Sequence, residues 1–150
     1  MIDFEKILVH TMSLSDLDEI KEILEKDFSD FWNYEIFKEE LVNTNSEYLV
    51  LRYENEIVCF GGIKNILDEA NIMNIATKNN MRNLGFAKLI LNALIDISKQ
   101  RNSTSITLEV NENNKAAIHL YKLFNFEEVG LRKKYYRNGD NAIIMTLDLK

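Results

Sequence analysis

An arginine, a glycine and an alanine are spaced in this sequence so that together they could hold an anion. Arg82, Gly85 and Ala87 stand where a strand-like segment leads through a polar loop into a long helical pattern. The first backbone N–H groups of a helix lack partners within it, and the helix dipole favours negative charge there. Gly85 would let the backbone approach a phosphate group, and Ala87 leaves room beside it. Arg82 and Lys88 could add positive charge. The spacing predicts a phosphate-binding loop, although a helix start with a chance glycine gives the same letters.

Two other side chains are of a kind that can move protons. Glu109 lies in the alternating segment 105–110, where a carboxylate could act as a general base, directly or through water. Tyr121 lies in a helical pattern, and its phenol could act as a general acid. The residues alone favour two simpler interpretations: a solvent-facing strand glutamate, and a tyrosine packed in the core beside Leu120 and Phe124.

Two adjacent tyrosines and one further acid are candidates for binding a substrate. Tyr135 and Tyr136 follow residues 132–134, which read Arg-Lys-Lys. Neighbouring residues of a strand face opposite sides of a sheet, so at most one of the two tyrosines would face a substrate. Ordinary hairpin packing explains the pair equally well. Glu69 could meet a cationic ligand, but a solvated turn charge is the favoured interpretation.

The composition describes a soluble globular protein. The 150 residues are 46% hydrophobic and 28% charged, which suits a single domain, 1–150. A net charge of −6 argues against nucleic-acid binding and mildly favours cationic partners. No signal peptide and no apolar run of roughly 20 residues is visible, so we expect a cytoplasmic protein without a membrane partner. The single cysteine, Cys59, excludes an internal disulfide, and His10 and His119 show no metal-ligand spacing, so no metal site is expected.

Hydrophobic periodicity and turn residues predict the elements that must position these side chains. The chain has no proline and five glycines, so its turns must rely largely on asparagine. Ser13 and Asn114 are expected helix caps, and Asn138-Gly139 is a hairpin signal. The apolar stripe of the helix after Ser13 is predicted at Leu17, Ile20, Ile23, Leu24 and Phe28. Strands are predicted at 2–11, 47–52, 57–66, 69–77, 105–110, 126–136 and 142–149, and helices from Ser13 to about residue 28, at 34–42, at 84–101 and after Asn114. This order predicts a mixed α/β fold with antiparallel hairpins.

The spacing of Arg82, Gly85 and Ala87, together with that order of elements, resembles the GNAT N-acetyltransferases. Their pyrophosphate loop reads Gln or Arg, two residues, Gly, one residue, then Gly or Ala. Within the family, the chain resembles the RimI group, bacterial enzymes that acetylate the N-terminal alanine of a small-subunit ribosomal protein. The segments that carry this resemblance include Leu-Asp-Glu-Ala at 67–70, Thr-Leu-Glu-Val at 107–110, Ala-Ile-Ile-Met at 142–145 and Phe-Trp at 31–32. The chain departs from the family at Asn79, where proline is usual, and at 124–126, where Phe-Asn-Phe replaces Leu-Gly-Phe.

The resemblance implies a GNAT (acyl-CoA N-acyltransferase) fold, with a mixed, mostly antiparallel seven-stranded sheet flanked by four helices. It implies acetyl-CoA as co-substrate and the N-terminal segment of a basic ribosomal protein as partner. Glu109 is then the general base and Tyr121 the general acid of direct transfer in a ternary complex, since no activating base is evident near Cys59. The implied cofactor contacts are Ile75, Ala76, Thr77, Arg82, Asn83, Leu84, Gly85, Phe86, Ala87, Lys88, Asn114 and Tyr121. The candidate substrate contacts are Glu69, Tyr135 and Tyr136.

Two other functions fit the same residues. One is acetylation of a small amine, such as a polyamine or an antibiotic, which would need a closed acidic pocket. The other is a non-catalytic module that binds acyl-CoA. The presence of both Glu109 and Tyr121 argues against the second of these.

Overall fold

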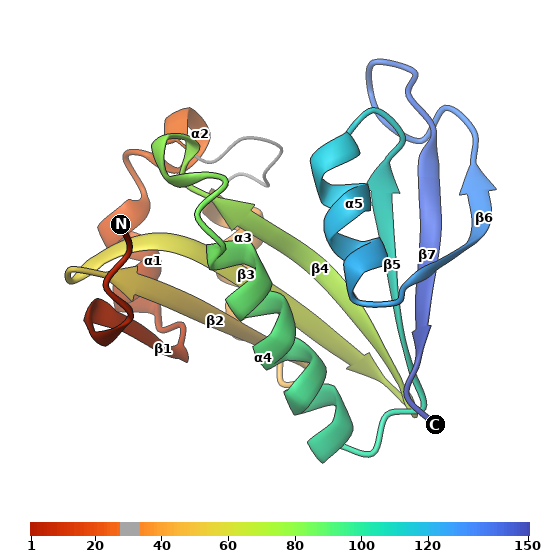
Figure 1. Ribbon diagram of the computed structural model, residues 1–150, viewed down its shortest axis with the longest axis horizontal. Helices are drawn as coiled ribbons and strands as arrows, with labels where there is room; N and C mark the ends of the chain where they lie inside the picture. The colour runs from red at the N-terminus through yellow and green to blue at the C-terminus, as the bar shows by residue number, and fades with distance from the viewer. Residues whose placement is uncertain (28–33) are drawn as a thin grey trace. The chain divides into compact units, whose positions relative to one another are not determined.

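Seven strands and five helices make up the described residues, 1–27 and 34–150, of the computed structural model (Figure 1). The strands are β1 (Ile7–Thr11), β2 (Ser46–Tyr53), β3 (Glu56–Ile66), β4 (Glu69–Thr77), β5 (Ser105–Asn111), β6 (Glu127–Arg132) and β7 (Ala142–Asp148). The helices are α1 (Leu14–Ile20), the one-turn α2 (Leu24–Asp27), α3 (Tyr34–Leu41), α4 (Phe86–Gln100) and α5 (Lys115–Leu123), with short 3₁₀ helices at Phe4–Lys6 and Asn79–Met81. Phe28 and the Phe31-Trp32 segment, which contributed to the predicted helix and to the family resemblance, lie outside the described residues.

The strand order is β1-β2-β3-β4-β5-β7-β6. β4 and β5 are parallel, whereas β1–β2, β2–β3, β5–β7 and β7–β6 are antiparallel. This confirms the predicted mixed, mostly antiparallel sheet. Among the described residues, no helix is both long and apolar enough to cross a membrane.

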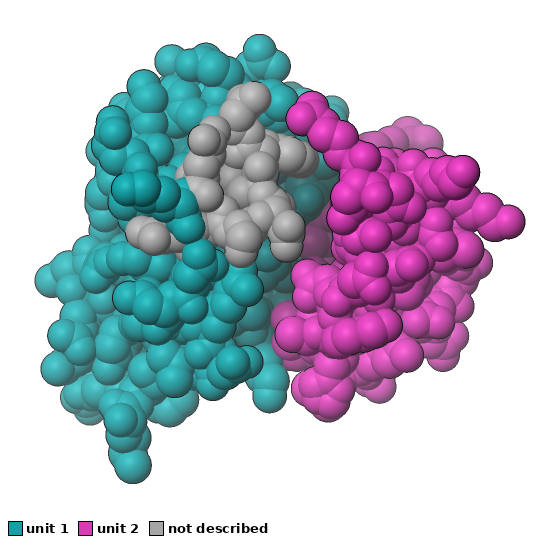
Figure 2. Space-filling model, turned by 90° about the horizontal axis from the view of Figure 1, so that it is seen from above, with its two compact units in different colours: residues 1–64, 73–97 teal, residues 65–72, 98–150 magenta. Residues whose placement is uncertain are grey.

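The described chain divides into two compact units, coloured separately in Figure 2. Unit 1 comprises Met1–Lys64 and Met73–Ile97, and unit 2 comprises Asn65–Ile72 and Ser98–Lys150. β4 therefore contributes its first four residues to unit 2 and its remainder to unit 1. A single functional domain over 1–150 stays a prediction.

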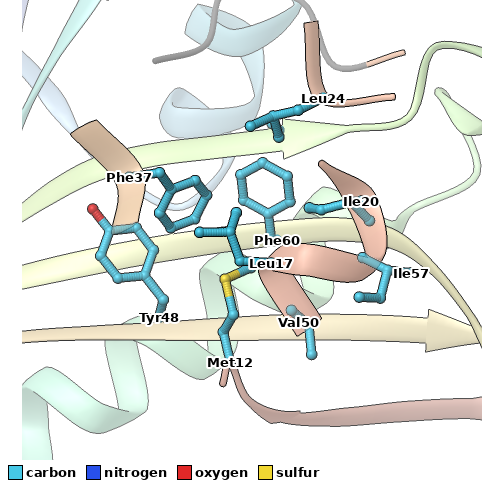
Figure 3. Close-up of a cluster of buried hydrophobic side chains, with 10 residues drawn as sticks. Met12, Leu17, Ile20, Leu24, Phe37, Tyr48, Val50, Ile57 and Phe60 are labelled. Atoms are coloured by element: carbon cyan, nitrogen blue, oxygen red, sulfur yellow. The ribbon is translucent and has the colours of Figure 1, made fainter. Parts of the chain in front are cut away.

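The core of unit 1 is built by the stripe that the sequence predicted for the first helix. Leu17, Ile20 and Leu24 are almost completely buried, in a cluster with side chains from α3, β2 and β3 (Figure 3). The Phe37 ring lies 4.9 Å from that of Tyr48 and 5.4 Å from that of Phe60, measured between ring centroids. Ser13 caps α1 in a reciprocal capping box with Asp16, as its position before the apolar stripe predicted.

Two glycines of β3 make room for this packing, a role that the sequence pattern did not predict. A Cβ atom on Gly62 would lie 2.0 Å from the ring of Tyr48, its partner across the β2–β3 pair. A Cβ on Gly61 would lie 2.6 Å from Ile90 of α4. Gly85, by contrast, would have nothing within 4 Å of an added Cβ atom, and its restriction is a backbone φ of +92°.

Four predicted boundaries were wrong. The first strand starts at Ile7, because Phe4–Lys6 forms a 3₁₀ turn, and the first predicted helix is broken at residues 21–23, between α1 and α2. α4 starts at Phe86 rather than at Leu84, because Gly85 has a φ of +92°, which is not helical. The strand predicted to reach residue 136 ends at Arg132, and Lys134 has a φ of +51°. Lysine rarely adopts a positive φ, so the sequence pattern gave no warning of the turn at Lys134.

In unit 2, β5 has the alternation that the sequence predicted. Ile106, Leu108 and Val110 are buried, whereas Glu109 is exposed on the opposite face. α5 lies beside β5 (Figure 1), and the buried side chains of this helix include Tyr121. The residues expected to transfer protons therefore lie on two elements of the same unit.

Candidate functional site

The loop before α4 contains two residues with a left-handed backbone conformation. Asn83 and Gly85 have φ angles of +63° and +92°, and the helix begins at Phe86. Residues 82–85 and Lys88 are exposed, so the turn that leads into this 15-residue helix is open to solvent. Phe86 is 1% exposed, and its ring centroid lies 5.6 Å from that of Tyr53. This packing anchors the start of the helix in unit 1. We call residues 82–88 the phosphate loop.

The approach to the phosphate loop is held by hydrogen bonds. The Asn79 side-chain amide donates to the Lys26 carbonyl oxygen at 3.0 Å, and the Lys78 N–H donates to the Val58 carbonyl oxygen at 2.8 Å. The Lys78 ammonium also pairs with Glu56. Asn79, which stands where the resembling family has proline, thus makes a side-chain bond to α2 that proline could not make.

The end of β4 carries the three other predicted cofactor contacts of unit 1. Ala76 is 6% exposed, whereas Ile75 and Thr77 are half-buried. Glu69–Asn71 of β4 pair with Ser105–Thr107 of β5, and this pairing ends at Asn71. Ile75–Thr77 therefore lie beyond the paired part of β4. Backbone groups of these three residues are therefore not used by that pairing.

Cys59 is unsuited to carry an acyl group. Its side chain is completely buried, with Sγ 3.3 Å from Thr77 Oγ1. Burial raises the pKa of the Cys59 thiol to about 12, so the nucleophilic thiolate is scarce at neutral pH. Direct transfer without an acyl-cysteine intermediate stays a prediction.

Glu109 holds an arginine on the exposed face of the unit 2 sheet. Its Oε2 atom lies 2.8 Å from Nε of Arg132, and the two side chains are 32% and 57% exposed. The Arg132 guanidinium also lies 5.8 Å from the ring centroid of Tyr135. Arg132 therefore connects the predicted base with one of the predicted substrate-binding tyrosines, a link that the sequence pattern did not predict.

Tyr121 is buried on α5 and keeps its proton. Tyr121 is 8% exposed, and the centroid of its ring lies 5.7 Å from the centroid of the Phe126 ring. Burial, with a smaller contribution from Tyr136, raises the pKa of the Tyr121 phenol above its usual value near 10. The phenol is therefore neutral at physiological pH, which is the form that can donate a proton.

The two tyrosines lie in a loop and not in a strand, so the prediction that they face opposite sides of a sheet was wrong. Tyr135 and Tyr136 fall between β6 and β7, and their rings meet edge to face with centroids 5.1 Å apart. The hairpin signal at Asn138-Gly139 is confirmed as a turn, in which the Gly139 N–H donates to the Tyr136 carbonyl oxygen at 2.9 Å. The contacts thus bring the pair of rings together rather than apart.

Asp140 fastens the tyrosine loop, which we define as residues 135–141, to the end of β5. Its carboxylate accepts hydrogen bonds from the side chains of Asn111, at 3.1 Å, and Asn138, at 2.9 Å. The hydrogen bonds from Asn113, Asn111 and Asn138 lower the pKa of the Asp140 carboxyl. The sequence analysis did not predict this network. The available signal is the abundance of asparagine at residues 111–114 and in the tyrosine loop.

The remaining predicted site residues of unit 2 are a helix cap, Asn114, and an exposed strand residue, Glu69. Asn114 is confirmed as a helix cap, since its Oδ1 accepts the Ala117 N–H at 3.1 Å. Glu69 is exposed at the start of β4, opposite Ser105, and is therefore about 13 Å along the sheet from Glu109. Within the described ranges, no group of three or more His, Cys, Asp or Glu side chains is placed to hold a metal ion.

Comparison with known proteins gives a consistent set of relatives. Residues 17–126 match the family described as the acetyltransferase (GNAT) family. A protein of Haemophilus ducreyi named ribosomal protein bS18-alanine N-acetyltransferase is 36% identical over 115 residues, which cover 73% of this chain and 79% of that protein. The crystal structure of the ribosomal-protein-S18-alanine N-acetyltransferase from Escherichia coli has a TM-score of 0.87 at 28% identity, covering 96% of this chain and 94% of that one. Arabidopsis thaliana NAA60, solved in complex with acetyl-CoA, has a TM-score of 0.84 at 19% identity, covering 95% of this chain and 98% of that one, and shows the fold alone.

Proposed function

This chain belongs to the acetyltransferase (GNAT) family, and on that premise we propose that it transfers an acetyl group from acetyl-CoA to the N-terminal alanine of a basic small-subunit ribosomal protein. The names of its relatives supply the substrate class, and the net charge of −6 suits a cationic partner. Activity on a ribosomal protein would place the enzyme in the cytoplasm.

The proposed chemistry has three demands. The substrate amine must lose a proton, the tetrahedral oxyanion must be stabilised, and the departing thiolate must gain a proton. An N-terminal ammonium has a pKa of roughly 7.7–8.0, compared with roughly 10.4 for lysine, so a modest base suffices for the first step. Acetyl-CoA supplies the activated thioester when it is bound.

Glu109 and Tyr121 are assigned the two proton transfers. One observation carries the proposal. Glu109 lies on the outward face of β5, between the buried Leu108 and Val110, and its exposed carboxylate can be reached by a substrate amine. Tyr121 retains its proton at neutral pH, as a general acid must. Because Cys59 is buried and holds its proton tightly, we propose direct transfer in a ternary complex rather than through an acyl-cysteine.

The phosphate loop is assigned to the pyrophosphate of coenzyme A. The exposed turn at residues 82–85 and the dipole of α4 favour an anion, and Arg82 and Lys88 add positive charge. Residues 75–77 offer backbone groups to the pantetheine arm, and Asn114 is assigned a cofactor contact beside its capping bond. Tyr135 and Tyr136 are assigned to the peptide, together with Glu69.

The test is mass spectrometry of two matched peptides after incubation with acetyl-CoA. Both peptides have the same sequence with one internal lysine; one begins with a free N-terminal alanine, and the N-terminus of the other is blocked. We expect one acetyl group on the α-amine of the first peptide and none on the second. Acetylation of a polyamine or antibiotic alone would instead identify a small-amine acetyltransferase. Acetyl-CoA binding without turnover on any amine would identify a binding module.

A further inference from the structure

Arg132 reaches Glu109 from a strand that is not its neighbour. In the unit 2 sheet, β7 lies between β5 and β6, and Glu109 is opposite Ile144, which is opposite Gly130. Arg132 lies two residues beyond Gly130, on the same face of the sheet, because side chains alternate along a strand. The 2.8 Å contact from Nε to the Glu109 carboxylate therefore requires the arginine side chain to cross β7.

Small residues leave the path of this side chain open. The register partner of Arg132 is Ala142, and the row that contains Glu109 ends in Gly130. A Cβ on Gly130 would lie 3.2 Å from Cδ1 of Ile144, tighter than ordinary packing, so a side chain there would crowd the surface that the arginine crosses. Glycine and alanine at these two places fit a guanidinium that lies across the strand.

The guanidinium is held by the same kinds of group that a substrate ammonium needs. Its Nε meets the carboxylate of Glu109, and its central carbon lies 5.8 Å from the centroid of the Tyr135 ring, within the range of a cation–π contact. Both of these groups are assigned above to the substrate amine and its peptide. With side chains 57% and 32% exposed, the ion pair is of the weak, solvent-screened kind that another cation can replace.

We propose that Arg132 occupies the ammonium position at Glu109 in the free enzyme, and that the N-terminal ammonium of the peptide must displace it to bind. Arg132 is then a specificity-determining residue, because every amine competes with a built-in cation. An amine gains the carboxylate only if its peptide makes further contacts, such as those with the tyrosine loop. This proposal rests on the proposed role of Glu109.

The test compares Arg132→Met with Lys133→Met, which removes the same charge from the adjacent residue. We expect Arg132→Met to lower KM for the alanine peptide by about two- to fivefold, in line with an exposed ion pair, with little change in kcat or in KM for acetyl-CoA. Methylguanidinium at millimolar concentration should inhibit Arg132→Met competitively against the peptide, because it refills the vacated position. Lys133→Met should keep the wild-type KM for the peptide. Thermal unfolding should show that both variants are folded. Arg132→Gln is a second variant that also removes the charge and should lower KM in the same way.

A double-mutant cycle separates this proposal from the proposed function. In the Glu109→Gln background, Arg132→Met should no longer change KM, because the carboxylate for which the cations compete is gone. The proposal is overturned if Arg132→Met leaves KM for the alanine peptide unchanged or raises it, or if Lys133→Met lowers that KM by the same factor. Either result leaves Glu109 as the base. Wild-type turnover in Glu109→Gln alone overturns the base assignment, and this inference with it.

Discussion

The two units offer candidate sites of different kinds. In unit 1 the phosphate loop presents backbone groups, and its shape depends on positive φ angles at Asn83 and Gly85. In unit 2 the site is a chain of side chains, from Glu109 through Arg132 to Tyr135. A backbone site tolerates changes of side chain but not of backbone conformation, whereas a side-chain site can fail through the loss of one atom.

This difference corresponds to a difference in the groups to be recognised. A pyrophosphate carries several oxygens with a fixed charge, which suit a row of N–H donors. An amine must be held and also lose a proton, which requires a particular titratable side chain. We therefore expect substitutions in unit 1 to change acetyl-CoA affinity and substitutions in unit 2 to change peptide kinetics.

The largest effect on the unit 1 side of this comparison is expected from Gly85→Ala. The left-handed backbone at φ +92° strains any side chain, although nothing within 4 Å would clash with the new methyl group. We expect acetyl-CoA affinity to fall by about tenfold, roughly 1.4 kcal/mol, measured by calorimetry. Gly139→Ala makes the same substitution at a φ of +91° in unit 2 and is the matched control, which should keep the wild-type acetyl-CoA affinity. Unchanged affinity in Gly85→Ala would show that the shape of the loop does not determine binding.

A smaller effect is expected from Asp140→Ala on the unit 2 side. The substitution removes the carboxylate that ties the tyrosine loop to Asn111, so KM for the peptide should rise while acetyl-CoA affinity stays as in the wild type. Because hydrogen bonds hold the pKa of Asp140 below its ordinary value near 3.9, this tie is fully present above that pH and is lost as the pH falls through the lower folded-state value. A change in acetyl-CoA affinity without a change in peptide KM would contradict the division between the units.

Much of the fold was predictable because its signals are local. The alternation of residues 105–110 gave the exposed position of Glu109, and the apolar stripe after Ser13 gave the buried side chains of α1. The boundary near Lys134 was missed because lysine rarely adopts a positive φ. Asn83 and Gly85 are of types that do adopt it, but the apolar period predicts a helix start at Leu84.

The side-chain partners of the candidate site were harder to predict than its members. The Glu109–Arg132 pair depends on the strand order β5-β7-β6, which places residues from separate hairpins on one face. The Asp140 network likewise joins two loops that are distant in the sequence. Resemblance to a family identified single residues, whereas the contacts between them required the three-dimensional register.

The most direct test of the proposed chemistry is the turnover of Glu109→Gln with the alanine peptide. Loss of a general base is expected to lower kcat by about 10²- to 10⁴-fold, while acetyl-CoA affinity and thermal stability remain near those of the wild type. Glu127→Gln makes the same chemical change on exposed β6 and should keep wild-type turnover. Wild-type turnover in Glu109→Gln would contradict the assignment of Glu109 as the base.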